Sequence, residues 1–72
     1  MRTIVDQNGR LWDVVTGRES YGVRVLLYCS RDGNAVRKSA LDSTSSLFAE
    51  NEFQLLSDYE LRQRLAHAEI WS

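Results

Sequence analysis

The chain has 72 residues, of which 43% are hydrophobic, and a formal net charge of −1. This length predicts a single domain spanning residues 1–72, because a second core needs a longer chain, and the hydrophobic content excludes a disordered tail. One cysteine excludes an internal disulfide, and one cysteine with one histidine cannot supply a four-ligand zinc site.

The charge is divided unevenly along the chain. Residues 1–41 carry seven basic and four acidic side chains, whereas residues 42–72 carry two basic and six acidic ones and contain neither glycine nor proline. The first part is expected to form a β-sheet and the second to form helices. The asymmetry fits either a charged partner for the basic part or ordinary solvated surfaces.

The N-terminal hairpin is predicted from strands over residues 2–7 and 10–16 that flank Asn8-Gly9. This dipeptide is the one most typical of a two-residue type I′ turn, in which both central residues need a positive φ. A two-residue loop would place Val5 opposite Trp12.

A polar connection over residues 17–21 leads to a second predicted hairpin. Its strands cover residues 22–30 and 34–41, and Asp32-Gly33 marks its turn. A two-residue loop pairs Tyr28 with Arg37. The two hairpins in series predict an antiparallel β-meander of three or four strands.

The helical part begins after a polar hinge over residues 42–46, which is rich in residues that cap helix N-termini. Residues 47–56 follow, and Ala49, Phe53 and Leu56 fall on one helical face there. The fold class is therefore α+β: the meander followed by one or two C-terminal α-helices packed on one face of the sheet.

A second helix start is indicated by Ser57 and Glu60, which have the spacing of a capping box. Leu61, Leu65 and Ala68 continue at helical spacing, and Trp71 lies near the end of that stretch. The pattern leaves open whether the helical part is one bent helix or two.

The predicted register divides the sheet into two faces. The face expected to be the core holds Val23, Val25, Leu27, Cys29, Val36 and Ala40, with Lys38 as a charged member, and Trp12, Val14 and Val5 are expected to join it. The other face holds Arg24, Leu26, Tyr28, Arg37, Ser39 and Leu41.

The second of these faces is the candidate interaction surface, formed by Arg24, Leu26, Tyr28, Arg37 and Ser39. Aromatic and arginine side chains are favoured at protein interfaces, and Arg37 opposite Tyr28 could form a cation–π contact. The alternative is an ordinary solvated face with a few exposed apolar groups.

No catalytic, cofactor-binding or metal-binding residues are predicted. His67 has no evident orienting partner, Cys29 is expected to be a buried thiol, and Asp6 and Asp13 are expected to form surface ion pairs. Three serines of the hinge are interpreted as caps instead of nucleophiles: Ser43, Ser45 and Ser46.

The function predicted from these features is that of a small non-catalytic interaction or accessory module, either a homodimer or the binder of another protein. The alternative is nucleic-acid binding through the basic sheet face, with Tyr28 stacking on a base. Its phosphate contacts would come from Arg10, Arg18, Arg24, Arg31, Arg37 and Lys38. The lack of a long apolar run argues against a membrane span. The absence of paired cysteines favours the cytoplasm, where thiols stay reduced.

Overall fold

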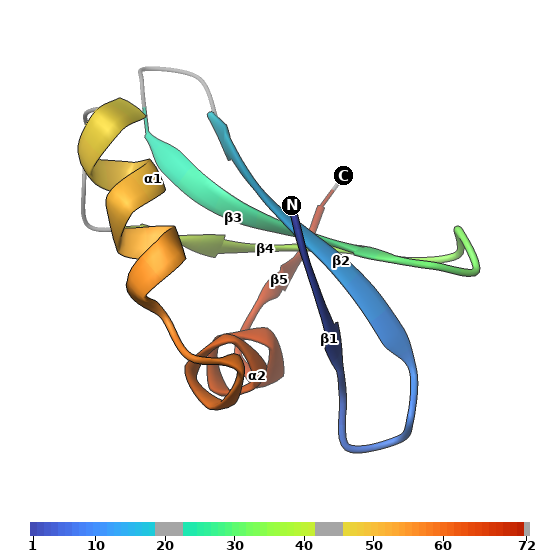
Figure 1. Cartoon of the computed structure of the whole chain (residues 1–72). Coiled ribbons are helices and arrows are strands. Elements are labelled where there is room, and N and C mark those ends of the chain that lie inside the picture. The colour runs from blue at the N-terminus through green and yellow to red at the C-terminus, as the bar shows by residue number, and fades with distance from the viewer. Residues whose placement is uncertain (19–22, 42–45, 72) are drawn as a thin grey trace.

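The computed structural model describes residues 1–18, 23–41 and 46–71. Within these ranges a five-stranded antiparallel sheet has the order β1-β2-β3-β4-β5. The strands are β1 (Arg2–Val5), β2 (Leu11–Arg18), β3 (Arg24–Ser30), β4 (Val36–Ala40) and β5 (Glu69–Ile70). Two helices, α1 (Ser46–Leu55) and α2 (Asp58–Ala66), connect β4 to β5 (Figure 1). The predicted α+β fold class is confirmed.

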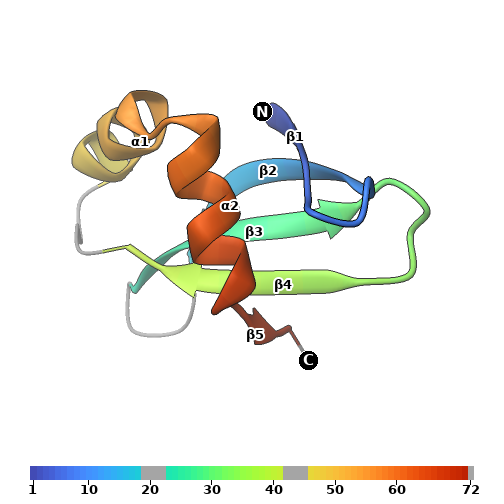
Figure 2. The same ribbon diagram turned by 90° about the horizontal axis from the view of Figure 1, so that it is seen from below.

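Both helices lie on the same face of the sheet. The first helix contacts β2 and β3, whereas the second contacts β1 and β4. Figure 2 shows α2 crossing in front of the strands, with α1 beside it. We call the covered side the inner face and the opposite side the outer face. No helix among the described residues is long and apolar enough to span a membrane.

The first hairpin differs from the prediction by one residue of register. Its ladder pairs Val5 with Leu11 and Ile4 with Trp12, because the loop contains five residues instead of two. The Asp6 carboxylate organises this loop by accepting hydrogen bonds from the amides of Asn8 (2.8 Å) and Arg10 (2.9 Å). A one-residue shift turns each side chain to the other face, so Ile4 is buried and Val5 is 45% exposed.

The second hairpin has the predicted register, with Cys29 opposite Val36 and Tyr28 opposite Arg37. Its turn contains Gly33 at a φ of +79°, where a residue with a side chain would be strained. Residues 19–22 of the connection between the hairpins, and residues 42–45 of the predicted hinge, lie outside the described residues.

The helical part forms two separate helices. Ala49, Phe53 and Leu56 are buried, as their spacing predicts. The predicted capping box is present, since the Ser57 hydroxyl accepts from the Glu60 amide and the Glu60 carboxylate accepts from the Ser57 amide.

The end of the chain differs from the expected helical continuation. Helix α2 stops at Ala66, and His67 forms its C-cap. Ala68 therefore lies beyond the helix, and Glu69–Ile70 return to pair with β4 as a short edge strand. Two residues are too few to show an alternating pattern, so nothing in the sequence signalled this strand.

The core lies on the face that we predicted to be open. The buried cluster consists of Ile4, Trp12, Val14, Leu26, Tyr28, Leu41, Ala49, Phe53, Leu56 and Leu61. By contrast, Leu27, Cys29 and Val36 are only half-buried and point to the outer face. For β3 and β4 the assignment of the two faces was therefore inverted, although the division of residues between the faces was correct. Trp12 and Val14 of β2 do lie in the core, as expected.

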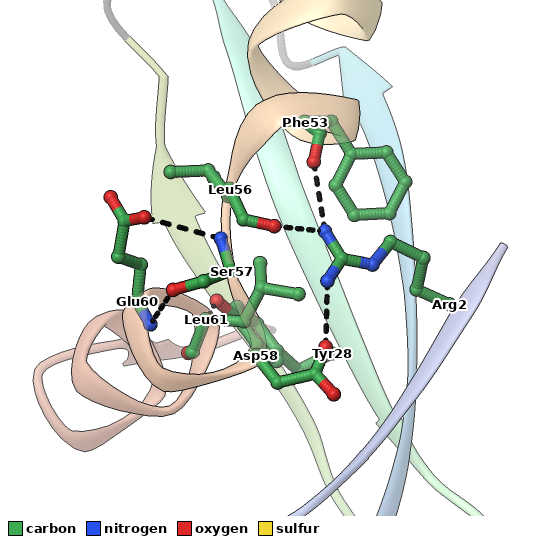
Figure 3. Close-up of polar contacts among 8 residues, drawn as sticks. All are labelled: Arg2, Tyr28, Phe53, Leu56, Ser57, Asp58, Glu60 and Leu61. Atoms are coloured by element: carbon green, nitrogen blue, oxygen red, sulfur yellow. Dashed lines mark hydrogen bonds and ion pairs between the residues drawn. The ribbon is translucent and has the colours of Figure 1, made fainter.

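Two polar ties fix the helices to the inner face (Figure 3). The buried Tyr28 hydroxyl donates a hydrogen bond of 2.9 Å to the Leu61 carbonyl in α2. The Arg2 guanidinium donates to the carbonyls of Phe53 (3.0 Å) and Leu56 and to the Asp58 carboxylate (2.6 Å). It also lies 5.7 Å from the Phe53 ring centroid. A single side chain from β1 thus caps the end of α1 and pairs with the start of α2.

We expect Arg2→Met to lower the free energy of unfolding by about 2–3 kcal/mol, because three acceptors lose a charged donor. Arg10→Met is the matched control. The Arg10–Asp32 pair is exposed and 3.8 Å long, and Arg10 also lies over Trp12, so its loss should cost at most about 1 kcal/mol. Urea denaturation of both variants measures the difference, and equal losses would contradict the role of Arg2.

Stability should also fall at alkaline pH. Burial raises the pKa of Tyr28 to about 12, above the value of about 10 for a tyrosine in an unfolded chain. Between these values the unfolded state has lost a proton that the folded state keeps, so the free energy of unfolding decreases as pH rises, by up to about 1.4 kcal/mol per pH unit.

Tyr28→Phe should remove this part of the pH dependence. At neutral pH the variant should lose about 1 kcal/mol, because the Leu61 carbonyl loses its donor. Urea denaturation of the two proteins between about pH 8 and pH 12 measures how the free energy of unfolding changes with pH across the range in which tyrosine loses its proton. The same slope in both proteins would show that Tyr28 does not carry the effect.

Candidate interaction surface

The five residues of the predicted surface do share one face, but that face is the covered one. Leu26 and Tyr28 are 0% exposed within the core, and Arg24, Arg37 and Ser39 are half-buried at its borders. The prediction that these residues form an open surface is therefore wrong. Arginine on a covered face is tolerated because its long aliphatic part can lie along the core while the guanidinium reaches the edge.

The expected cation–π contact between Arg37 and Tyr28 is also not formed. Tyr28 directs its hydroxyl to α2, and the Arg37 Nη1 donates instead to the Val36 carbonyl at 3.2 Å. Cation–π contacts in the described ranges involve Arg2 with Phe53, Arg10 with Trp12 and Lys38 with Trp71.

The open apolar surface lies on the outer face of the sheet. Alternation along the paired strands places these apolar side chains there: Val5, Leu11, Val15, Leu27, Cys29 and Val36. Val5 and Leu11 are 45% and 39% exposed, and the other four are half-buried by their neighbours in the sheet. An antiparallel sheet with a solvated face normally carries polar residues on it, so this composition is unusual.

Gly17, near the end of β2, belongs to the outer face and pairs with Val25 of β3. A Cβ at this position would lie 2.7 Å from Cδ1 of Leu27, which shows that Leu27 lies over the glycine. Val25 adjoins this contact and is buried, although it is not part of the core cluster. Leu27 and Val25 thus occupy the space that a side chain at position 17 would need.

The charged groups on the outer face have partners within the chain. Asp13 accepts hydrogen bonds from Arg31 (3.2 Å) and from the Thr3 hydroxyl (2.8 Å), and these bonds lower the pKa of its carboxyl group. The Lys38 ammonium lies 5.4 Å from the Trp71 ring centroid. Pairing of this kind reduces the cost of removing the face from water.

A second, narrower apolar surface lies on the solvent side of α1. Leu47, Phe48 and Leu55 are 66%, 64% and 84% exposed there. Its length is limited to about three helical turns, and it is therefore much smaller than the outer face of the sheet. Sequence reasoning missed both surfaces. It assigned the apolar side chains of the outer face of the sheet to the core, and in α1 it considered only the buried face.

The side chains considered for chemistry are dispersed. Asp6 lies in the first loop and Asp13 on the outer face, so they do not form a carboxylate pair. His67 is exposed at the C-cap of α2, and Cys29 is half-exposed on the outer face instead of buried. Ser43 and Ser45 lie outside the described residues, and Ser46 begins α1. The described part of the chain has no group of three or more His, Cys, Asp or Glu side chains suited to a metal ion.

The basic side chains expected to contact phosphates do not form one surface. Arg24 and Arg37 belong to the inner face, whereas Lys38 belongs to the outer face. Arg10 and Arg31 lie near the hairpin turns and pair with Asp32 and Asp13 respectively. The basic residues that were predicted to share one face of the sheet are therefore distributed over its inner face, its outer face and the end that carries the hairpin turns.

Comparisons with family models, curated proteins and solved structures gave no match for this chain.

The half-exposed position of Cys29 generates a prediction about thiol reactivity. We expect a thiol reagent to label Cys29 in dilute folded protein at a rate that does not change in the destabilised Arg2→Met variant. A thiol pointing into the core would react only after opening, and its labelling rate would then rise with destabilisation. Such a rise would contradict the assignment of Cys29 to the outer face.

Proposed function

We propose that this protein is a small, non-catalytic interaction module of the cytoplasm that self-associates through the outer face of its sheet. The observation that supports the proposal is the broad apolar surface around Leu27, which the helices of the same chain leave uncovered. Contiguous apolar surfaces of this kind on small proteins usually mark sites of interaction.

The size of the face suits a dimer. The two longer dimensions of the whole molecule are 32 Å and 26 Å, and this upper bound on the outer face is of the order of the roughly 800 Å² that each partner buries in a standard interface. The stripe on α1 offers much less area. We therefore assign the principal contact to the sheet and not to the helix.

The charge pattern favours a second copy as the occupant. The outer face carries both signs of charge, with Asp13 beside Arg31 and Lys38 on another strand. A face of mixed, internally paired charge can meet itself across a two-fold axis without strong repulsion. Two copies would then form a sandwich of two sheets about 10 Å apart, with the helices on the outside.

A dimer would also offset the small size of the chain. A domain of about 60–70 residues buries a smaller fraction of its surface than a larger one and gains little stability from its own core. Covering Val5, Leu11 and Leu27 with a second copy would remove further apolar surface from water. The cytoplasm fits a single unpaired thiol on that face, since thiols stay reduced there.

The expected molar mass by light scattering after size exclusion is twice 8.3 kDa at high protein concentration. Leu27→Glu should shift the protein to 8.3 kDa at the same concentration, with at least about a tenfold weaker association, because the dimer would bury a carboxylate. A circular dichroism spectrum of the variant is the check that it remains folded.

Leu55→Glu is the matched control. It introduces the same charge at a leucine that is 84% exposed on α1, on the other side of the molecule, and the dimer should persist. A wild-type monomer at every concentration would refute self-association. If Leu55→Glu were a monomer while Leu27→Glu remained a dimer, the interface would lie on α1 and not on the sheet.

A further inference from the structure

A cleft on the helix side of the molecule has properties that the proposed dimer does not use. It has a volume of about 240 Å³ and lies between α2, the β1–β2 loop and the inner face of the sheet. Trp12 and Leu65 contribute apolar surface to its wall. Because it opens on the opposite side from the outer face, self-association through the sheet would leave it accessible.

Two arginines line this cleft. Arg37 and Arg62 are both half-buried, and neither forms an ion pair with a described residue. The Arg37 Nη1 donates only to the carbonyl of its neighbour Val36. In contrast, other arginines of the chain, such as Arg2 and Arg64, have carboxylates within 4 Å. A guanidinium has five N–H donors, so the cleft presents a surplus of donors.

The cleft has one carboxylate in its wall, and this group is already engaged. Oδ2 of Asp6 accepts from the Trp12 indole at 2.9 Å, and Oδ1 accepts from the amides of Asn8 and Arg10. The bond from Trp12, with the two loop amides, lowers the pKa of Asp6, so the group is ionised at neutral pH. It serves the loop and leaves both guanidiniums without a carboxylate acceptor among the described residues.

The side-chain amides of Gln7 and Asn8 also line the cleft. Neither makes a hydrogen bond with another described side chain. Each amide brings two N–H donors and one carbonyl acceptor, so it can donate to a ligand beside the arginines without fixing the charge of that ligand. Because the two guanidiniums have no acceptor atoms, a ligand that binds them must supply acceptors, and it should carry negative charge.

We propose that this cleft binds a carboxylate attached to a small apolar group. A guanidinium holds a carboxylate through two parallel hydrogen bonds, and Trp12 and Leu65 provide the apolar contact. The net charge of two arginines and ionised Asp6 is +1, which one carboxylate balances, whereas a phosphate dianion would add repulsion from Asp6. The volume is below the roughly 300–1,000 Å³ of pockets for larger ligands, so a single acidic side chain or a short free acid fits.

The test is a titration of the ¹⁵N-labelled protein followed by NMR. The Trp12 indole N–H is the reporter, since it donates to Asp6 at the cleft, and a Trp71→Phe variant identifies its signal. The probes are butyrate, N-acetylglutamate amide, inorganic phosphate and the neutral analogue butyramide. We expect a saturable shift of the Trp12 signal with the carboxylates and none with butyramide.

Two variants decide whether the arginines are responsible. Arg62→Gln removes a cleft guanidinium from the surface of α2, and it should weaken carboxylate binding at least about tenfold. Arg31→Gln removes an arginine outside the cleft that pairs with Asp13, and it should leave binding unchanged. Binding of N-acetylglutamate amide at least as tight as that of butyrate would identify an acidic side chain as the ligand, and the reverse order would identify a free acid.

Three results would overturn the proposal. They are the absence of a saturable shift with either carboxylate at tens of millimolar, equal affinity in Arg62→Gln and the unmodified protein, and tighter binding of phosphate than of the carboxylates. The molar mass of the protein is independent of all three results, so failure here leaves the proposed self-association unaffected.

Discussion

The position of Arg2 on the first strand determines much of this structure. Its guanidinium holds the point where α1 ends and α2 begins, and the Tyr28 hydroxyl holds α2 from the centre of the sheet. Both side chains belong to the inner face, because alternation gives them the same direction as Val14 across the ladders. The helices are therefore joined to this face by the polar bonds of Arg2 and Tyr28.

The two helices can cover only one face, and this leaves the other open. In β3 both sets of alternate residues are apolar, with Leu26 and Tyr28 on one side and Val25 and Leu27 on the other. A strand that is apolar on both sides is typical of a sheet covered on both sides. The chain supplies one cover, and a second layer must come from another molecule if the outer face is to be covered as well.

This double apolar pattern explains what the sequence could and could not predict. Local signals were reliable: the capping box of Ser57 and Glu60 and the register around Asp32-Gly33 depend on a few neighbouring residues. The choice of face depends on where the helices dock, which requires contacts such as that of Arg2 with Asp58, 56 residues away. Arg24 and Arg37 led to the prediction that this face is exposed. An arginine at the edge of a core can, however, keep its guanidinium in solvent while its aliphatic part is buried.

The first hairpin shows the same limit on a smaller scale. Asn8-Gly9 does form a turn, with Gly9 at a φ of +82°, but the Asp6 carboxylate binds two loop amides and widens the loop. The same carboxylate accepts the Trp12 indole N–H. A single residue thus sets the register of β1 and contributes to the wall of the cleft, and neither effect is visible in the sequence pattern of the strands.

The two proposed sites share strand β4 but use opposite sides of it. Val36 and Lys38 belong to the outer face, whereas Arg37 between them belongs to the cleft. A contact on one side therefore does not exclude a ligand on the other.

In a dimer that buries both outer faces, the two clefts would lie on the outside of the assembly. A partner with two acidic groups at the right separation would then bind more tightly than either group alone, because the second contact is intramolecular. Self-association and carboxylate recognition would in this way reinforce each other without any change in fold.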